Sequence, residues 1–120
     1  MSGSEGRGGP GYEDGSVVVD YRVSASVLEA IVRWSLAGDD RLRLAAGGPR
    51  GVRHAITVSV EGGSAAVAVY LRGRLGEDLL DLGARVKHTV AARLGVMTGL
   101  AIARVDVHVV GVFRAGDVDA

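Results

Sequence analysis

Two polar side chains near the C-terminal end of the chain have the types and spacing of a catalytic pair. Asp106 and His108 alternate with valines in the stretch MTGLAIARVDVHVVGV, residues 97–112. Residues two apart in a strand point to the same side, so a carboxylate and an imidazole at this spacing can touch. An Asp–His pair is a fragment of a catalytic triad, but the serines and threonines of this chain lack an adjacent base or an elbow motif. We therefore expect no catalytic residue, and we interpret both side chains as contact residues on the outer face of a sheet.

A metal or cofactor site is not expected either. The histidines, His54, His88 and His108, fall on three different predicted elements, none forms a His-x-x-x-His pair, and the chain has no cysteine. The glycine-containing loops GGPRG and LRGRLGEDL have neither a dinucleotide fingerprint nor the Lys-Ser/Thr of a phosphate-binding loop. These absences predict no metal, no cofactor and no small-molecule substrate.

Arginines gather in the sequence around the ends of a predicted hairpin. They are Arg41, Arg43, Arg50, Arg53, Arg72 and Arg74. The cluster is either a local basic patch for an acidic partner, lipid headgroups or RNA, or a scatter of solubilising charge, and the sequence leaves both interpretations open. The contact surface that we expect consists of Arg50, Arg53, Arg72, Arg74, Asp106 and His108.

Composition limits the classes of function. The 120 residues are 48% hydrophobic and 4% aromatic, which is enough for one small domain with an aliphatic core. Lys+Arg and Asp+Glu number 14 each, so no overall field favours nucleic acid, and a nucleic-acid partner is not expected. The absence of cysteine favours a reducing compartment. No apolar run approaches the roughly 20 residues of a membrane span, and the N-terminus lacks the apolar core of a signal peptide. A cytoplasmic protein is the expectation.

The first half of the chain predicts a tail, a strand and a helix. Residues 1–15 are rich in glycine and small polar residues and are predicted to be disordered. The β-type run 16–23 precedes a helix within 24–40, which Ser24 or Ser26 can cap, with Ser26 and Glu29 in capping-box spacing. Trp34 is interpreted as a packing side chain at the edge of the apolar stripe. A brief strand over 41–46 is then expected.

The second half predicts a hairpin, a second helix and a last strand. The β-type runs 52–60 and 65–72 are joined by a Gly-Gly turn, and Val67, Val69 and Leu71 share one face. The spacing of leucines and valines predicts a helix over 77–94, with Gly95 as its C-cap. In the last strand, the face with Val105 and its alternate valines is opposite the face with Asp106 and His108.

The order β-α-β-β-α-β, with an extra short strand after the first helix, predicts a two-layer α+β fold. We expect a small, mostly antiparallel sheet with both helices packed on one face. One domain spans residues 16–113, between the tail 1–15 and a second polar tail, 114–120.

The stretch VMTGLAIARVDVHVVGV, residues 96–112, resembles the signature of the alkaline-shock protein family, envelope-stress proteins common in Gram-positive bacteria. Members end in a Thr-Gly turn followed by an alternating valine strand that closes on Gly-Val. The matching positions are Thr98, Gly99, Val105, Val107, His108, Val109, Gly111 and Val112. The element order of residues 16–113 is compatible with the family.

The resemblance implies a small, cytoplasmic, non-enzymatic protein of cell-envelope homeostasis, held near the membrane by a membrane-anchored protein partner. It also implies self-association, and the half-exposed, valine-rich sheet predicted here is a surface on which a homo-oligomer can form. The alternative that the residues leave open is a small α+β nucleic-acid-binding module that uses the arginines around the hairpin.

Overall fold

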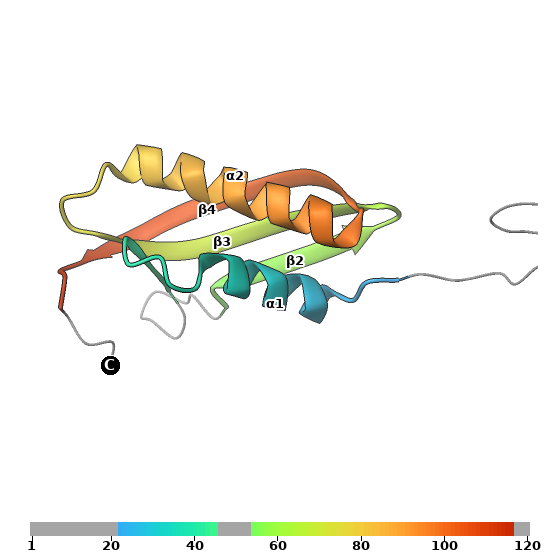
Figure 1. Ribbon diagram of the computed structural model, residues 1–120, viewed down its shortest axis with the longest axis horizontal. Coiled ribbons are helices and arrows are strands. Elements are labelled where there is room, and N and C mark those ends of the chain that lie inside the picture. Colours follow the sequence, from blue (N-terminus) through green and yellow to red (C-terminus); the bar gives the residue numbers. More distant parts are fainter. Residues whose placement is uncertain (1–21, 46–53, 117–120) are drawn as a thin grey trace, which may run out of the picture.

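A computed structural model describes residues 22–45 and 54–116, which form two helices and a four-stranded sheet (Figure 1). In chain order the elements are α1 (Ala25–Leu36), β1 (Leu42–Leu44), β2 (Ile56–Glu61), β3 (Ser64–Arg74), α2 (Leu79–Thr98) and β4 (Ala101–Phe113). The predicted strand 16–23 lies mostly outside the described residues, and its last two residues have no regular structure. From α1 onward the order follows the prediction, including the short strand after the first helix.

The helix α1 is capped at its N-terminus by Ser24, whose hydroxyl accepts a hydrogen bond from the Val27 amide at 3.3 Å. This cap leaves Ser26 inside the helix, and the Glu29 carboxylate pairs with Arg33 at 3.2 Å instead of reaching back to the first amides. The predicted capping box is therefore wrong. The physical reason is that an i,i+4 cation is available to Glu29 on the same helix face.

The central strand is β3, which pairs with all three other strands. Its first half pairs antiparallel with β2, from Ile56↔Val69 to Glu61↔Ser64, and its second half pairs antiparallel with β1. On the opposite edge β4 pairs parallel with β3 over the whole length, from Ser64↔Ala101 to Arg74↔Phe113. Two of the three strand pairings are antiparallel, as expected, and the parallel one is the pairing bridged by α2.

The helix α2 is capped at its N-terminus by Asp78, whose carboxylate accepts a hydrogen bond from the Asp81 amide at 3.1 Å. It continues through Gly95 to Thr98 and ends at Gly99, which has φ 74°. The prediction that Gly95 caps the helix is wrong, because the left-handed backbone conformation that favours glycine at a helix end lies four residues later.

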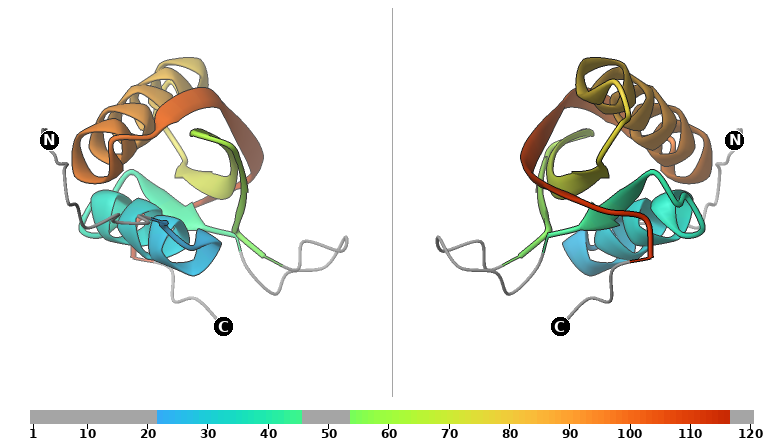
Figure 2. Two further views of the ribbon diagram at one scale, coloured as in Figure 1. Left: turned by 90° about the vertical axis from the view of Figure 1, so that its right-hand side faces the viewer. Right: turned by 90° about the vertical axis from the view of Figure 1, so that its left-hand side faces the viewer.

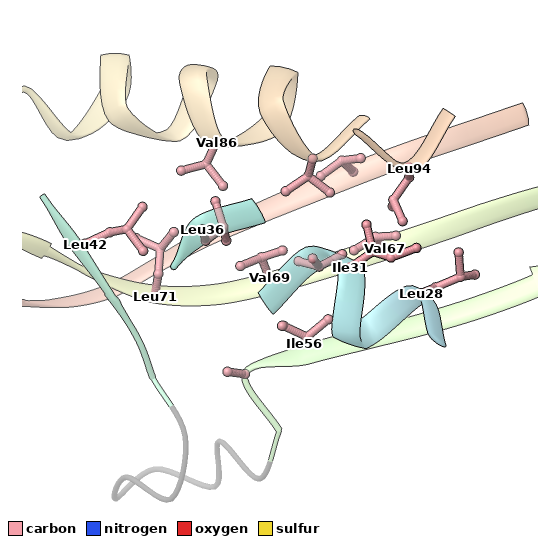
Figure 3. Close-up of a cluster of buried hydrophobic side chains, with 14 of the residues drawn as sticks. Leu28, Ile31, Leu36, Leu42, Ile56, Val67, Val69, Leu71, Val86 and Leu94 are labelled. Atoms are coloured by element: carbon pink, nitrogen blue, oxygen red, sulfur yellow. The ribbon is translucent and has the colours of Figure 1, made fainter. Parts of the chain in front are cut away.

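Both helices cover the same face of the sheet, with α1 over β2 and α2 over β4 (Figures 1 and 2). Their apolar stripes and the alternate residues of β3 meet in one aliphatic layer, which Figure 3 shows in close-up. Its most completely buried large side chains are Leu28, Val32, Ile56, Val69, Leu71, Leu82, Val90 and Leu94. The predicted two-layer α+β fold is confirmed.

Trp34 does not take the packing position expected of it. Its side chain is 59% exposed, and the Arg93 guanidinium from α2 lies 4.9 Å from the ring centroid. The neighbouring stripe of Leu28, Ile31 and Val32 already fills the space over the sheet. The ring instead makes a cation–π contact between the two helices.

Candidate interaction surface

The sheet face opposite the helices is uncovered by any described element, and we call it the open face. On β3 the odd-numbered residues 65–71 are buried toward the helices, so the even-numbered ones point to the open face. The register adds their neighbours from the flanking strands. The open face consists of Arg43, Thr57, Ser59, Ala66, Ala68, Tyr70, Arg72, Arg104, Asp106 and His108.

Asp106 and His108 lie on the open face, as their alternation with Val105 and Val107 predicts. Val105 is buried, and Val107 packs against the core from the other side of β4. The Asp106 carboxylate is held by Arg104, with one oxygen 3.0 Å from Nε and 2.8 Å from Nη2. Its nearest charge partner is thus a guanidinium that is itself 67% exposed. The hydrogen-bond partner of this carboxylate is therefore the Arg104 guanidinium and not the His108 imidazole.

The His108 ring instead stacks on Tyr70, its register partner on β3. The ring centroids are 4.6 Å apart and the planes are 11° from parallel. The separation is within the range in which aromatic pairs attract each other beyond simple burial. Tyr70 was not among the predicted contact residues. Its position opposite His108 follows only from the parallel register of β3 and β4.

Next to this stack, the open face is hollowed. The hollow has a volume of about 290 Å³. Small side chains of the central strand make its floor, and polar side chains of the flanking strands make its walls. Its lining includes Thr57, Ser59, Ala66, Ala68, Arg104 and Asp106.

The other end of the open face carries Arg43 and Arg72, which are register partners on β1 and β3. The Arg43 guanidinium lies 4.1 Å from the centroid of the Phe113 ring, and the ring is 5% exposed. The aliphatic part of Arg72 lies beside Gly111, where an added Cβ would be 3.6 Å from it. The side chains of both arginines therefore lie against the sheet. Because Gly111 has no side chain, the aliphatic part of Arg72 can lie beside it.

Arg74 belongs to a different group of charges, at the end of β3. Its guanidinium is 2.7 Å from the Glu77 carboxylate and 3.4 Å from that of Asp40. Beside them Arg41 binds Asp39 through Nε at 2.9 Å and Nη2 at 2.8 Å, and this hydrogen bonding lowers the pKa of the Asp39 carboxyl. These pairs join the loop after α1 to the start of α2, so the structure separates Arg74 from Arg72.

Two predicted contact residues, Arg50 and Arg53, lie outside the described residues. Of the three histidines, His54 precedes β2 and His88 lies on the exposed side of α2, so the fold does not bring them to His108. Within residues 22–45 and 54–116, no three His, Asp or Glu side chains gather closely enough to hold a metal ion.

The residues of the family-like motif occupy the turn into β4 and the strand itself. Thr98 is 7% exposed, and its hydroxyl donates to the Leu94 carbonyl at 2.6 Å and accepts from the Leu100 amide at 3.2 Å. Gly99 then reverses the chain, and the Ala101 amide donates to the Gly63 carbonyl at 2.9 Å. The Thr-Gly pair thus ends α2 and attaches the start of β4 to the β2–β3 hairpin.

The outer edge of β4 pairs with no other described strand. Register shifts set Ala103 and Val110 apart as extra residues, so Arg104 to Val109 form a regular segment between two irregularities. Val110 and Val112 are 44% and 48% exposed beyond that segment.

Comparisons with known proteins identify no relative. No family model, no curated protein and no solved structure matches the chain. Among the described helices, none combines the length and apolar character needed to cross a membrane.

Proposed function

We propose that this chain is a non-enzymatic interaction or scaffold protein of cell-envelope homeostasis, which self-associates and is held near the membrane by a membrane-anchored protein partner. The resemblance of residues 96–112 to the alkaline-shock protein signature supports the class of function and the cytoplasmic location. The structural observation that carries the proposal is the outer edge of β4, with its exposed valines.

An unpaired strand edge presents a row of amide and carbonyl groups to a second strand. The regular segment from Arg104 to Val109 is six residues long, which is an ordinary strand length. A two-fold antiparallel pairing of two such edges would make one eight-stranded sheet from two copies, because each copy contributes four strands.

The two copies could pair in more than one register, and the charges of the facing side chains favour one of them. A two-fold axis at Asp106 would place two carboxylates opposite each other, which destabilises a strand pair. An axis at Val107 places Asp106 of one copy opposite His108 of the other, and Val105 opposite Val109. The second register is the one that we propose, because it sets the Asp106 carboxylate opposite an imidazole that can donate a hydrogen bond to it, and makes apolar pairs on the other face.

The test is the molar mass in solution, measured by size-exclusion chromatography with light scattering over a range of protein concentrations. The native chain should assemble, and the double variant Val110→Lys/Val112→Lys should be monomeric, since lysine at a strand edge opposes edge pairing. The matched control, Leu80→Lys/Val96→Lys, places two lysines at more exposed positions on α2, 88% and 85%, and should assemble normally. A native chain that stays monomeric at the highest concentration would contradict the proposed self-association.

The cellular half of the proposal has its own test. Deleting the coding sequence from its organism should slow growth under alkaline or cell-wall stress, and the native gene should restore growth while the Val110→Lys/Val112→Lys gene should not. If both genes restored growth, the envelope role would not depend on assembly. If the deletion strain grew normally, the envelope role would be contradicted.

A further inference from the structure

We propose that one end of the helix layer, the surface formed by α1 and α2, binds directly to an anionic phospholipid bilayer, with Trp34, Val96 and Met97 entering its apolar region and Arg93 binding lipid phosphate. The inference goes beyond the proposed function, in which a protein partner holds the chain near the membrane. It uses neither the edge of β4 nor the open face. Contact of this kind is made from outside the bilayer and needs no membrane-spanning helix.

Four exposed apolar side chains gather on the two helices. Val27 and Trp34 are seven residues apart on α1, which is two helical turns, so they share one side of that helix. Val96 and Met97 are in the last turn of α2, three and four residues after Arg93. The Arg93 guanidinium lies 4.9 Å from the centroid of the Trp34 ring and brings the two groups together. We call these five residues the helix patch.

The helix patch combines side chains that suit the headgroup region of a bilayer. Tryptophan is enriched at this level because its ring is apolar and its N–H is polar. Arginine lays its apolar stem along apolar surface and keeps its charged head among water or phosphates. Valine and methionine supply apolar surface for the acyl chains. A guanidinium stacked on an indole ring therefore fits a boundary that is apolar on one side and anionic on the other.

The charge of the helix layer is complementary to an anionic bilayer. The two helices carry four cations and two carboxylates, which are Arg33, Arg85, Lys87 and Arg93, and Glu29 and Asp81. Both carboxylates are already paired, Glu29 with Arg33 at 3.2 Å and Asp81 with Arg85 at 2.8 Å. Within residues 22–45 and 54–116, neither Lys87 nor Arg93 pairs with a carboxylate. The layer therefore has two cations in excess, in a chain whose formal net charge is zero.

The other end of α2 is less suited to an anionic surface. Leu80 is exposed there, but Asp78 lies two residues before it and Asp81 one residue after it. A negative surface repels these carboxylates and so opposes the entry of Leu80. At 1.5 Å per residue, Leu80 and Val96 are about 24 Å apart along the helix. The two ends of one helix thus offer an internal comparison.

Other occupants fit the helix patch less well. A second copy seated on the same patch would bring two Arg93 guanidinium groups into one interface, where like charges repel. A protein partner would need a carboxylate placed against Arg93, because a guanidinium buried without an anion is costly. A bilayer has phosphates across its whole surface, at the level just above the acyl chains. It therefore satisfies Arg93 and Trp34 together without a matched arrangement of residues.

The proposed pairing of β4 edges would place two helix patches on one side of the assembly. Residues paired across neighbouring strands point to the same side of a sheet. The proposed register sets Val105 opposite Val109 of the second copy, and both of these positions pack toward the helices. The two helix layers would therefore face the same bilayer, and linked contacts bind more tightly than single ones. This gain rests on the proposed self-association, whereas the contact of one chain does not.

The experiment measures binding of the full chain to large vesicles, by flotation and by the fluorescence of Trp34, the only tryptophan in the sequence. Vesicles of mixed phosphatidylglycerol and phosphatidylcholine should bind the chain roughly 25-fold more tightly than pure phosphatidylcholine, at about fivefold for each of two excess cations. Added salt should weaken this binding. The emission of Trp34 should shift to the blue as the ring leaves water, and lipids with brominated acyl chains should quench it.

Variants assign the binding to the helix patch. Val96→Ser/Met97→Ser should weaken it by roughly 10-fold or more, since each methylene group removed from water is worth about fourfold. Leu80→Ser, at the other end of α2, is the matched control and should bind as the native chain does. Arg93→Gln should weaken binding about fivefold. Arg85→Gln should weaken it less, because Arg85 is about 12 Å farther along the helix, beyond the screening length of about 10 Å. Circular dichroism should show that all four variants are folded.

Four results would overturn the proposal. They are no binding to phosphatidylglycerol vesicles at low salt, binding that leaves the emission of Trp34 unshifted and unquenched, equal binding by the native chain and the folded Val96→Ser/Met97→Ser variant, and full competition by poly-glutamate. The last result would assign the helix patch to an acidic protein.

Light scattering without vesicles separates this inference from the self-association. A native chain that is monomeric in solution but binds vesicles as expected would contradict the self-association alone. A native chain that assembles but does not bind vesicles would contradict the lipid contact alone.

Discussion

The rings of Tyr70 and His108 stack across the parallel β3–β4 pairing, with centroids 4.6 Å apart. The two residues are register partners, so the stack tests the alignment of the two strands directly. It also joins a strand in the middle of the sheet to the strand at its edge, on the face that the helices leave uncovered. A change in register by one residue would move His108 to the helix face.

The stack should therefore be measurable as a coupling energy. In a double-mutant cycle with Tyr70→Leu and His108→Ala, urea unfolding should give an interaction of about 0.5–1.5 kcal/mol. The same cycle with Tyr70→Leu and His88→Ala should give no coupling, because His88 lies on α2. Equal values for the two cycles would contradict the stacked geometry.

The two glycines near the end of α2 should respond to alanine with opposite signs. Gly99 has φ 74°, so Gly99→Ala should lower the free energy of unfolding by about 1 kcal/mol or more. Gly95 is inside the helix with nothing within 4 Å of an added Cβ, so Gly95→Ala should raise it by about 0.5–1 kcal/mol. Chemical denaturation of the two variants decides where the helix ends. If Gly95→Ala were the destabilising change, the helix would end where the sequence alone places it.

The hydroxyl of Thr98 should be worth more to stability than its methyl group. Thr98→Val keeps the shape but leaves the Leu100 amide without that acceptor, which should cost about 1–3 kcal/mol. Thr98→Ser keeps the hydroxyl and should cost less. Thermal unfolding of both variants gives the comparison, and a more stable Val variant would argue against the buried hydrogen bonds.

Stability should fall in acid partly through Asp39. Hydrogen bonds from Arg41 lower the pKa of this carboxyl in the folded chain, so the ionised form favours folding above the unfolded pKa of about 3.9. That contribution should be lost as the pH falls from about 5 through the lower, folded pKa. Asp39→Asn should destabilise the chain at neutral pH and flatten its acid dependence, as measured by urea unfolding between about pH 7 and pH 2.

Asp81→Asn is the control for this pH series. Asp81 pairs with Arg85 at 2.8 Å on the surface of α2, with its side chain 53% exposed. Exposed ion pairs of this kind contribute about 0–1 kcal/mol. A larger change in acid dependence for Asp81→Asn than for Asp39→Asn would reject the assignment.

The sequence predicted the elements better than their ends. Alternation correctly placed Val67, Val69 and Leu71 toward the helices, because strand periodicity survives an error in the strand's bounds. The end of a helix depends on the backbone conformation of one residue. Gly95 and Gly99 are therefore equally plausible C-caps of α2 until their φ angles are known. Trp34 was expected to pack because tryptophan is buried on average. That average does not show whether neighbouring side chains already fill the core.

The candidate surface could be predicted only in part. The outward direction of Asp106 and His108 followed from their spacing, but their partners Arg104 and Tyr70 depend on rotamers and on the β3–β4 register. The hollow depends on two alanines from one strand and polar residues from two others, which only the sheet order brings together. The sequence also does not show that the turn into α2 places Asp40 and Glu77 beside Arg74, because this depends on the path of the chain after β3.

The parallel pairing of β3 and β4 also sets an order of events during folding. Ser64 and Ala101, the first partners in this pairing, are 37 residues apart in the sequence, whereas β2 and β3 meet across a tight turn. The hairpin can therefore form early, and the edge of β3 must wait until α2 and β4 have been synthesised. Until then the nascent chain has an open central strand, so a chaperone that shields it should raise the yield of folded protein. Synthesis slowed within the codons of α2 should lower that yield by prolonging the exposure.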